Sequence, residues 1–473
     1  MNWINRKSQN GNSDREKDFP FARWMSWLFL AASIVLLIYT YYLAEITYQG
    51  GSSSTYFKYY LISLTGILFW GVVLRLREGI RANIVTMVTS LVVAIYLFEG
   101  GLTFFGLGQI DRVAAAEELG VAYDQRTKSE VIKDLIAEGI DAVPAVRPRD
   151  VLTMDERLLP LGGISNKTTV GENDSGNRMI YLSDRYGFNN PDSEWDAKEV
   201  EWLLTGDSFT EGVAVEPGQD IAGQLRVITQ ESAINIGRSG NGPLMELAEL
   251  TEYAGVIKPK RVLWIYYRND LISVKYHIDD LQRDKENPLL MRYMEDGFSQ
   301  NLINRQKEID SKLEKYVLLK AQSQSKSQAQ SQSKSKSQLV KTRWVRLYAI
   351  RSIISFDDDV DVDYSLFAKI LTKAKAQVES WGGKLYFVYL PEYGLFSNKI
   401  ISHNNFSEKA EVIEVVKALN IPVIDIYQEI IAHQPDPFAL FPFRLPGHYN
   451  EDGYAEVAKA IVTSVNKYEQ SNK

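Results

Sequence analysis

The sequence predicts a membrane anchor of three transmembrane helices followed by an α/β domain with a doubly wound, mostly parallel sheet. Two observations support this fold class. Apolar residues are concentrated in the first quarter of the 473-residue chain, although the mean hydropathy of the whole chain is only -0.20. After residue 197, short apolar runs alternate with amphipathic stretches, which is the pattern of strands and helices in a parallel sheet.

The first three apolar stretches are long enough to cross a bilayer. Residues 24–44 carry no charge, and residues 58–75 and 82–99 are apolar runs bounded by charged residues. About 20 such residues span the hydrocarbon core as a helix, and flanking aromatic and basic side chains extend shorter runs to the interface. We therefore expect residues 1–106 to form an anchor that contacts membrane lipids through helices at about 24–44, 58–75 and 82–99.

The basic residues predict the orientation of this anchor. The first connection holds a single cation, Lys58. The segment before the first helix and the connection between the second and third are richer: Arg6, Lys7, Arg15, Lys17, Arg23, Arg75, Arg77 and Arg81. Basic segments stay in the cytoplasm. The N-terminus should therefore be cytoplasmic, and the C-terminal domain periplasmic or otherwise extracytoplasmic.

Residues 107–197 are expected to form a connector and lead-in, and residues 198–466 the α/β domain. Five apolar runs predict buried strands at 199–206, 232–237, 261–267, 384–390 and 422–426. Amphipathic patterns predict helices at 218–229, 243–255, 363–381, 406–419 and 450–466. Residues 321–338 are a low-complexity run of Ser, Gln, Lys and Ala, which predicts a solvated, mobile insertion.

Composition excludes several kinds of site. There is no cysteine, so disulfides, thiolate metal sites and a Cys nucleophile are all absent. Only four histidines occur, which argues against a His-rich metal centre. The net charge of -7 argues against a nucleic-acid partner.

Polar residues follow the first three predicted strands and precede the last helix. Ser208 stands directly after the first strand on a Gly-Asp turn, where a nucleophile would be presented at the carboxyl edge of the sheet; the plainer alternative is a helix cap. Gly240 and Asn269 follow the next two strands and could donate to an oxyanion, or could serve a turn and a loop cap. His448 is placed to act as the general base, although a single His is more often structural.

These four loops, taken in order, resemble those of the SGNH (GDSL-like) hydrolase family over about residues 198–466. The resemblance implies a flavodoxin-like fold, with Ser208 in Gly206-Asp207-Ser208 as nucleophile and His448 as base. It implies oxyanion donors at Ser208, Gly240 and Asn269, and acyl-ester chemistry with no metal or cofactor.

Two positions depart from the family's pattern. Tyr267 stands where the family has a glycine two residues before the asparagine, and Leu445 stands where it has the aspartate that orients the histidine. The chain would then work with a Ser-His pair, or take a carboxylate from elsewhere, such as Asp436.

The nearby Arg238 and Arg268 could bind an anionic substrate, but pairing with neighbouring acids is the favoured interpretation.

The sequence therefore predicts a membrane-anchored, extracytoplasmic serine esterase or O-acyltransferase acting on acylated small molecules, glycans or lipids. Envelope glycans are a natural substrate given the expected location. The alternative is a catalytically silent module that binds polysaccharide or supports an envelope modification complex, which Leu445 and Tyr267 favour. Labelling by a serine-reactive fluorophosphonate separates the two.

Overall fold

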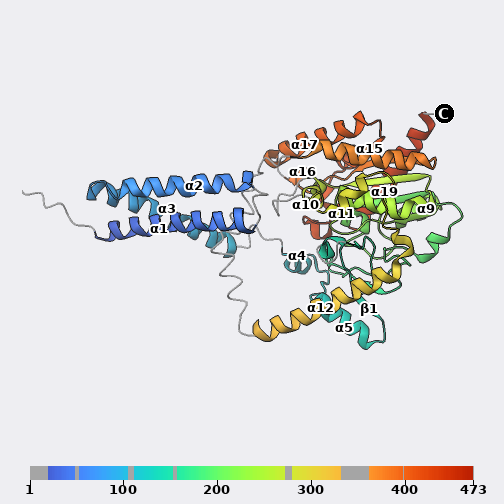
Figure 1. The fold of residues 1–473 in the computed structure, drawn as a ribbon, viewed down its shortest axis with the longest axis horizontal. Coiled ribbons are helices and arrows are strands. Elements are labelled where there is room, and N and C mark those ends of the chain that lie inside the picture. Colours follow the sequence, from blue (N-terminus) through green and yellow to red (C-terminus); the bar gives the residue numbers. More distant parts are fainter. Residues whose placement is uncertain are drawn as a thin grey trace, which may run out of the picture. The chain divides into compact units, whose positions relative to one another are not determined.

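The computed structural model describes residues 20–47, 53–104, 111–152, 157–271, 280–331, 362–397 and 399–471 (Figure 1). They fall into two compact units. The first comprises the described residues up to 104, and the second comprises those from 111 onward.

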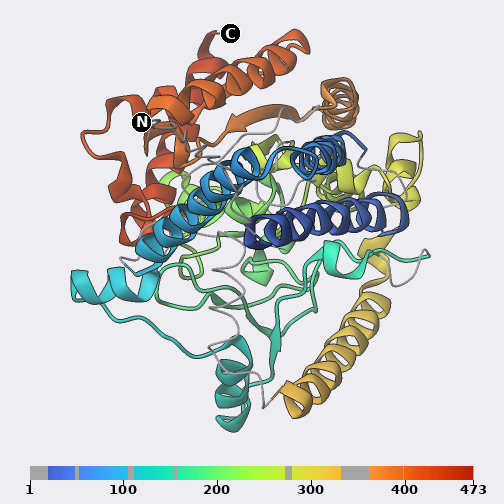
Figure 2. The same ribbon diagram turned by 90° about the vertical axis from the view of Figure 1, so that its left-hand side faces the viewer.

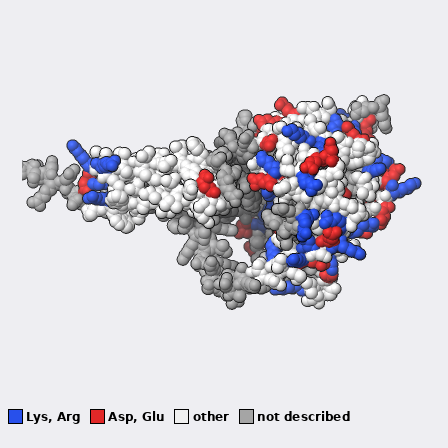
Figure 3. Space-filling model, viewed as in Figure 1, with Lys and Arg blue, Asp and Glu red and all other residues white. Residues whose placement is uncertain are grey.

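The first unit contains three long helices. They are α1 (Pro20–Tyr41), which continues as a π-helix η1 (Tyr42–Thr47), α2 (Ser53–Val73) and α3 (Glu78–Phe104). Each is long and apolar enough to cross a membrane. Their outward surface carries large apolar side chains such as Trp24, Leu68 and Leu97, and Figure 3 shows charged residues only toward the ends of this unit. Such a surface would be unfavourable in water, so the unit fits a membrane anchor.

The second unit is built on five parallel strands in the order β5-β4-β6-β7-β8. In chain order this is 2-1-3-4-5, the flavodoxin-like arrangement, in which the order reverses between the first and third strands. The predicted fold class is confirmed, and each strand lies within its predicted run. The strands are β4 (Trp202–Gly206), β5 (Ala233–Asn235), β6 (Arg261–Tyr266), β7 (Lys384–Tyr389) and β8 (Val423–Asp425).

Helices cover both faces of this sheet because both faces are apolar. In β6, Val262 and Trp264 join one core, while Leu263 and Ile265 join the other, as the alternation of side chains along a strand requires. The helices α15 (Tyr364–Ser380) and α17 (Lys399–Ala418) contact each other and lie at the same side of the domain in both views (Figures 1 and 2). The first core includes α8 (Pro243–Glu249), α15 (Tyr364–Ser380) and α17 (Lys399–Ala418); the second includes α7 (Ile221–Thr229), α18 (Ile426–Glu429) and α19 (Glu451–Ser471).

The residues between the two expected domains fold as part of the second unit. They form α4 (Arg112–Leu119), α5 (Lys128–Ala137) and a small sheet of β1 (Ala142–Pro144), β2 (Thr168–Val170) and β3 (Ile180–Leu182). β2 and β3 are antiparallel, so residues 171–179 form a hairpin loop. Met179 and Tyr181 pack against Val213 and Ala214 of the larger domain, which fixes this hairpin beside the carboxyl edge of β4.

The low-complexity run differs from its prediction. Its described part is helical, as the end of α12 (Gln306–Ser331), and the rest lies outside the described residues. Ile309 and Leu313 anchor the start of α12 in the core, and Ala, Gln and Lys are adequate helix formers, so the helix continues into the run.

The remaining elements are short connections. The helices are α6 (Ser208–Glu211), α9 (Gly255–Ile257), α10 (Asp280–Asp284), α11 (Pro288–Met291) and α16 (Gly394–Ser397), with a π-turn η4 (Leu250–Ala254). The 3-10 turns are η2 (Pro148–Val151), η3 (Asp192–Asp196), η5 (Arg268–Asp270), η6 (Arg292–Met294), η7 (Leu302–Asn304), η8 (Ile431–His433), η9 (Pro437–Leu440) and η10 (Pro442–Arg444).

Candidate active site

Ser208 is the first residue of α6, immediately beyond the carboxyl end of β4. The carboxylate of Asp207 caps this helix by accepting the N–H of Phe209 at 2.9 Å. Gly206 has φ +156°, and a Cβ there would lie 2.2 Å from Oγ1 of Thr210, so the turn needs glycine. As the first residue of a helix, Ser208 has a backbone N–H with no acceptor inside the helix. Its hydroxyl and its N–H are therefore both presented at the sheet edge.

His448 lies in the loop before α19, and its Nε2 is 2.8 Å from Oγ of Ser208. The imidazole also packs against the ring of Phe209, with 4.7 Å between centroids. The structure thus brings together the two residues that the sequence proposed as nucleophile and base, although they are 240 positions apart.

The carboxylate beside His448 belongs to Asp174. Oδ2 of Asp174 is 2.7 Å from Nδ1 of His448, on the side of the ring opposite Ser208. A carboxylate can only accept there, so Nδ1 carries the proton and Nε2 is left to accept the hydroxyl proton of Ser208. Burial alone would raise the pKa of Asp174, but the hydrogen bond and charge of His448, with the charge of Arg112, outweigh it and lower the pKa below its ordinary value.

The structure places Asp436, which the sequence suggested as a possible orienting acid, on another partner than His448. Its carboxylate instead pairs with Arg444, with 2.8 Å between Oδ1 and Nη2, and both side chains are largely exposed. Asp174 was missed because it lies in the β2–β3 hairpin loop, outside the segment that carries the four motifs. That loop is held in shape by Asn173, whose Oδ1 accepts the N–H of Gly176 at 2.9 Å.

Arg112, at the start of α4, joins the two loops that carry Asp174 and His448. Its Nη2 donates to the carbonyl oxygen of Pro446 at 3.0 Å and lies 3.5 Å from Oδ2 of Asp174. Nothing in the sequence distinguished this residue from other arginines of the connector. Its position allows it to hold the carboxylate of Asp174 and the loop of His448 at a fixed distance from each other.

Gly240 presents a backbone N–H that donates no hydrogen bond to any described residue. Its loop is tied to the nucleophile's loop, because the N–H of Arg238 donates to the carbonyl oxygen of Gly206 at 3.1 Å. Gly240 has φ +78°, which favours glycine. Among the described residues, the N–H of Gly240 therefore remains available to donate to a ligand.

Asn269 lies on η5, directly beyond β6. Its Nδ2 donates to Oδ2 of Asp280 at 3.3 Å, and its amide also lies close enough to Asp207 to lower the pKa of that carboxyl, although burial of Asp207 raises it overall. The neighbouring Tyr267 stacks on Phe209, with 4.1 Å between ring centroids. The side chain at the position of the expected glycine therefore packs on the residue that follows Ser208.

The two arginines near these loops are paired with acids. Arg238 is buried and lies 3.0 Å from Oε1 of Glu211, whose other oxygen accepts the N–H of Ser239. Arg268 donates to Oε2 of Glu408 at 2.7 Å. The pairing interpretation holds for both, and these ion pairs fix the loops that follow β5 and β6.

Beneath these loops lie buried carboxyl groups that the sequence did not indicate. Burial raises the pKa of Asp207, and burial together with repulsion between the groups raises the pKa of Glu246 and Asp270 well above their ordinary values. These carboxyl groups therefore bind a proton more readily than exposed carboxyl groups do.

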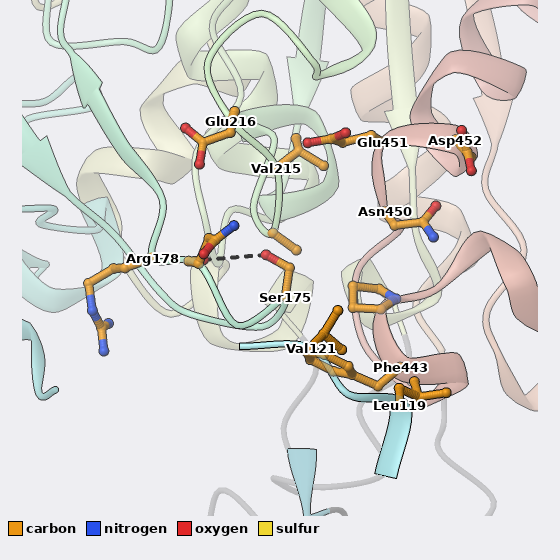
Figure 4. A pocket seen from close by; sticks show the side chains of 13 residues that line it. Leu119, Val121, Ser175, Arg178, Val215, Glu216, Phe443, Asn450, Glu451 and Asp452 are labelled. Carbon is orange, nitrogen blue, oxygen red and sulfur yellow. Dashed lines mark hydrogen bonds between the residues drawn. The ribbon is translucent and has the colours of Figure 1, made fainter. Parts of the chain in front are cut away.

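A pocket of about 340 Å³ lies next to the site (Figure 4). Ser175 and Asn450 in its lining are close in sequence to Asp174 and His448. One part of the lining is apolar, with Val121 and Phe443, and another is acidic, with Glu216 and Glu451. Ser208 is not among the lining residues, so the pocket adjoins the site without containing the nucleophile.

Comparisons with known proteins show the following. No protein-family model matches the chain, and no curated protein matches it. Solved structures similar to it include a lipase/acylhydrolase from Enterococcus faecalis (14% identity, 57% of this chain and 97% of that chain, TM-score 0.32). They also include the acetyl xylan esterase AlAXEase (12%, 56% and 100%, TM-score 0.31) and a member of the lipolytic protein G-D-S-L family from Veillonella parvula (14%, 56% and 97%, TM-score 0.28).

The name of the Veillonella parvula protein is that of the family which the four loops resemble. The strand order is that of a flavodoxin-like sheet, and the contacts among Ser208, His448 and Asp174 form the candidate site.

Proposed function

We propose that this protein is a membrane-anchored serine esterase or O-acyltransferase that uses Ser208, His448 and Asp174. The observation that carries the proposal is the continuous chain Asp174–His448–Ser208, with contacts of 2.7 and 2.8 Å. A serine hydroxyl is a weak nucleophile unless a base takes its proton, and a base works best when a third group fixes its tautomer. All three groups are in hydrogen-bonding range.

The proposed reaction has two halves. Oγ of Ser208 attacks the ester carbonyl carbon as its proton passes to Nε2 of His448, and the charge that develops on the carbonyl oxygen is met by the N–H groups of Ser208 and Gly240 and by Asn269. The bond to the alcohol oxygen breaks, and that oxygen takes the proton from His448. Water or an acceptor hydroxyl then attacks the acyl carbon while its proton passes to Nε2 of His448. The bond between the acyl carbon and Oγ of Ser208 breaks, and Oγ takes the proton from His448.

The orientation of the membrane anchor determines which esters the α/β unit can reach. If the basic segments of the anchor are cytoplasmic, the α/β unit works outside the cytoplasm, where O-acylated envelope glycans and lipids are the available esters. Transfer to a sugar hydroxyl and hydrolysis by water share the same acyl-serine, so both follow from the same residues.

The alternative of a silent binding module loses its main support. It rested on Leu445 in place of an orienting acid, and Asp174 supplies a carboxylate on the required ring nitrogen. Tyr267 narrows the site beside Phe209, which is compatible with a small acyl group.

Fluorophosphonate labelling of the full-length protein in detergent tests the proposal. We expect covalent labelling of the wild type, and loss of labelling in S208A and in H448A, because only an activated hydroxyl reacts quickly. Thr210→Ser is a matched control, since it retains a hydroxyl two residues away in the same helix. Equal labelling of wild type and S208A, or none in a folded wild type, would reject the proposed function.

A further inference from the structure

Arg149, on η2, lies against the backbone of Gly240. A Cβ built on Gly240 would lie 2.8 Å from Cδ and from Nε of Arg149 and 2.9 Å from its guanidinium carbon. From these distances and ordinary bond lengths, the amide nitrogen of Gly240 lies no more than about 6 Å from the guanidinium. A charged group therefore flanks the N–H that is proposed to hold the oxyanion.

This guanidinium forms no ion pair or hydrogen bond with any described residue. The two neighbouring arginines both have acidic partners. Arg147 pairs with Asp150 at 2.8 Å. Arg283 pairs with Asp280 and Asp284, and it also donates to the carbonyl oxygen of Gly240 at 3.1 Å. Arg238 and Arg268 are paired as well. Arg149 thus differs from the other arginines around these loops.

Keeping such a charge is unfavourable for the free protein. Arg149 is partly buried, and burial, followed by the charges of Arg147 and Arg283, lowers its pKa, although the charges of Asp280 and Asp150 act in the opposite direction. An unpaired, partly desolvated charge costs stability unless a partner arrives. A ligand anion at this position would supply the partner, and the planar guanidinium fork matches the two oxygens of a carboxylate.

We propose that Arg149 binds an anionic group of the substrate, so that the ester processed at Ser208 carries a carboxylate in its acyl part or in its alcohol part. This inference rests on the proposed function, because that function makes the ligand an ester that reacts at Ser208. The preference for an anionic ligand concerns binding alone, so it can be measured without turnover. The short distance from Gly240 places the carboxylate within a few bonds of the reacting carbonyl.

The test uses the full-length S208A protein, which binds esters without consuming them. Two pairs of ligands each differ in a single group. For the alcohol part, 3-O-acetylglucuronate carries a carboxylate where 3-O-acetylglucose carries a hydroxymethyl group, and for the acyl part, monomethyl succinate carries a carboxylate where methyl butyrate carries a methyl group. Titration calorimetry should show that one anionic ligand binds on the order of 10- to 100-fold more tightly than its neutral partner, the range of a charge-assisted hydrogen bond. The pair that shows the preference identifies the charged part.

Substitutions then assign the preference to Arg149. S208A with R149Q should lose the preference, and S208A with R149K should keep part of it, because lysine retains the charge without the fork. Arg292→Gln is the matched control, since Arg292 is largely exposed and lies over the ring of Phe298.

Two results would overturn the inference: a preference below twofold in both ligand pairs, or a preference that survives R149Q. Fluorophosphonate labelling of the protein with Ser208 intact is recorded alongside. Absence of labelling counts against the proposed function, whereas labelling without a charge preference counts against the anion site alone.

Discussion

Replacing Asp174 by Asn should lower the rate of acyl-enzyme formation by on the order of 1,000-fold, or about 4 kcal/mol in the barrier. The same substitution in Ser-His-Asp enzymes costs roughly 10,000-fold, because the amide favours the imidazole tautomer whose Nε2 is already protonated. Asp174 retains a side-chain exposure of 20%, so solvent screens part of its charge and we expect the smaller loss.

The matched control is Asp436→Asn. Asp436 pairs with Arg444 at the surface, and exposed ion pairs are worth about 0 to 1 kcal/mol, so we expect activity within about threefold of wild type. The assay is the release of 4-nitrophenol from 4-nitrophenyl acetate by the detergent-solubilised protein, with S208A as the background. A D174N protein that keeps more than a tenth of the wild-type rate, or a D436N protein that falls as far, would refute the assignment of the acid.

Three further outcomes are expected. Asn269→Ala should slow 4-nitrophenyl acetate turnover on the order of 100-fold through kcat, the usual cost of one oxyanion donor, and an effect on KM alone would contradict that role. Arg112→Ala should slow turnover roughly tenfold by loosening the acid and the histidine loop, with partial rescue in Arg112→Lys; an unchanged rate would remove the positioning role. Burial raises the pKa of Asp184 to about 6, so the folded state binds this proton more tightly than the unfolded state does. The unfolding free energy should therefore rise by about 1 kcal/mol more between pH 7 and pH 5 in wild type than in D184N, measured by proteolysis in urea; equal slopes would contradict the raised pKa.

The large sheet could be predicted because its strands are continuous apolar runs. The runs around Leu203, Leu263 and Phe387 are buried on both faces of the sheet, and such runs are typical of the strands of a parallel sheet. The three strands of the small sheet could not be predicted, because each has only three residues and mixed burial.

Ser208 and His448 could be found because the residues beside them carry local signals. The Gly-Asp turn after a buried strand and the loop before the last helix are visible in the sequence itself. Asp174 has no such signal. It reaches His448 only because the β2–β3 hairpin packs against Val213 and Ala214, and the two residues are separated by 274 positions. Contacts of this kind depend on tertiary packing, which neither spacing nor composition encodes.

The acyl-enzyme itself gives the most direct test of the central claim. Full-length protein is mixed with 4-nitrophenyl acetate, quenched in acid within the first turnovers, digested and analysed by mass spectrometry. We expect one acetyl group on Ser208, which is absent when His448 is replaced by Ala. Acetate release with no acetyl group on Ser208, or acetylation that is unaffected by H448A, would contradict it.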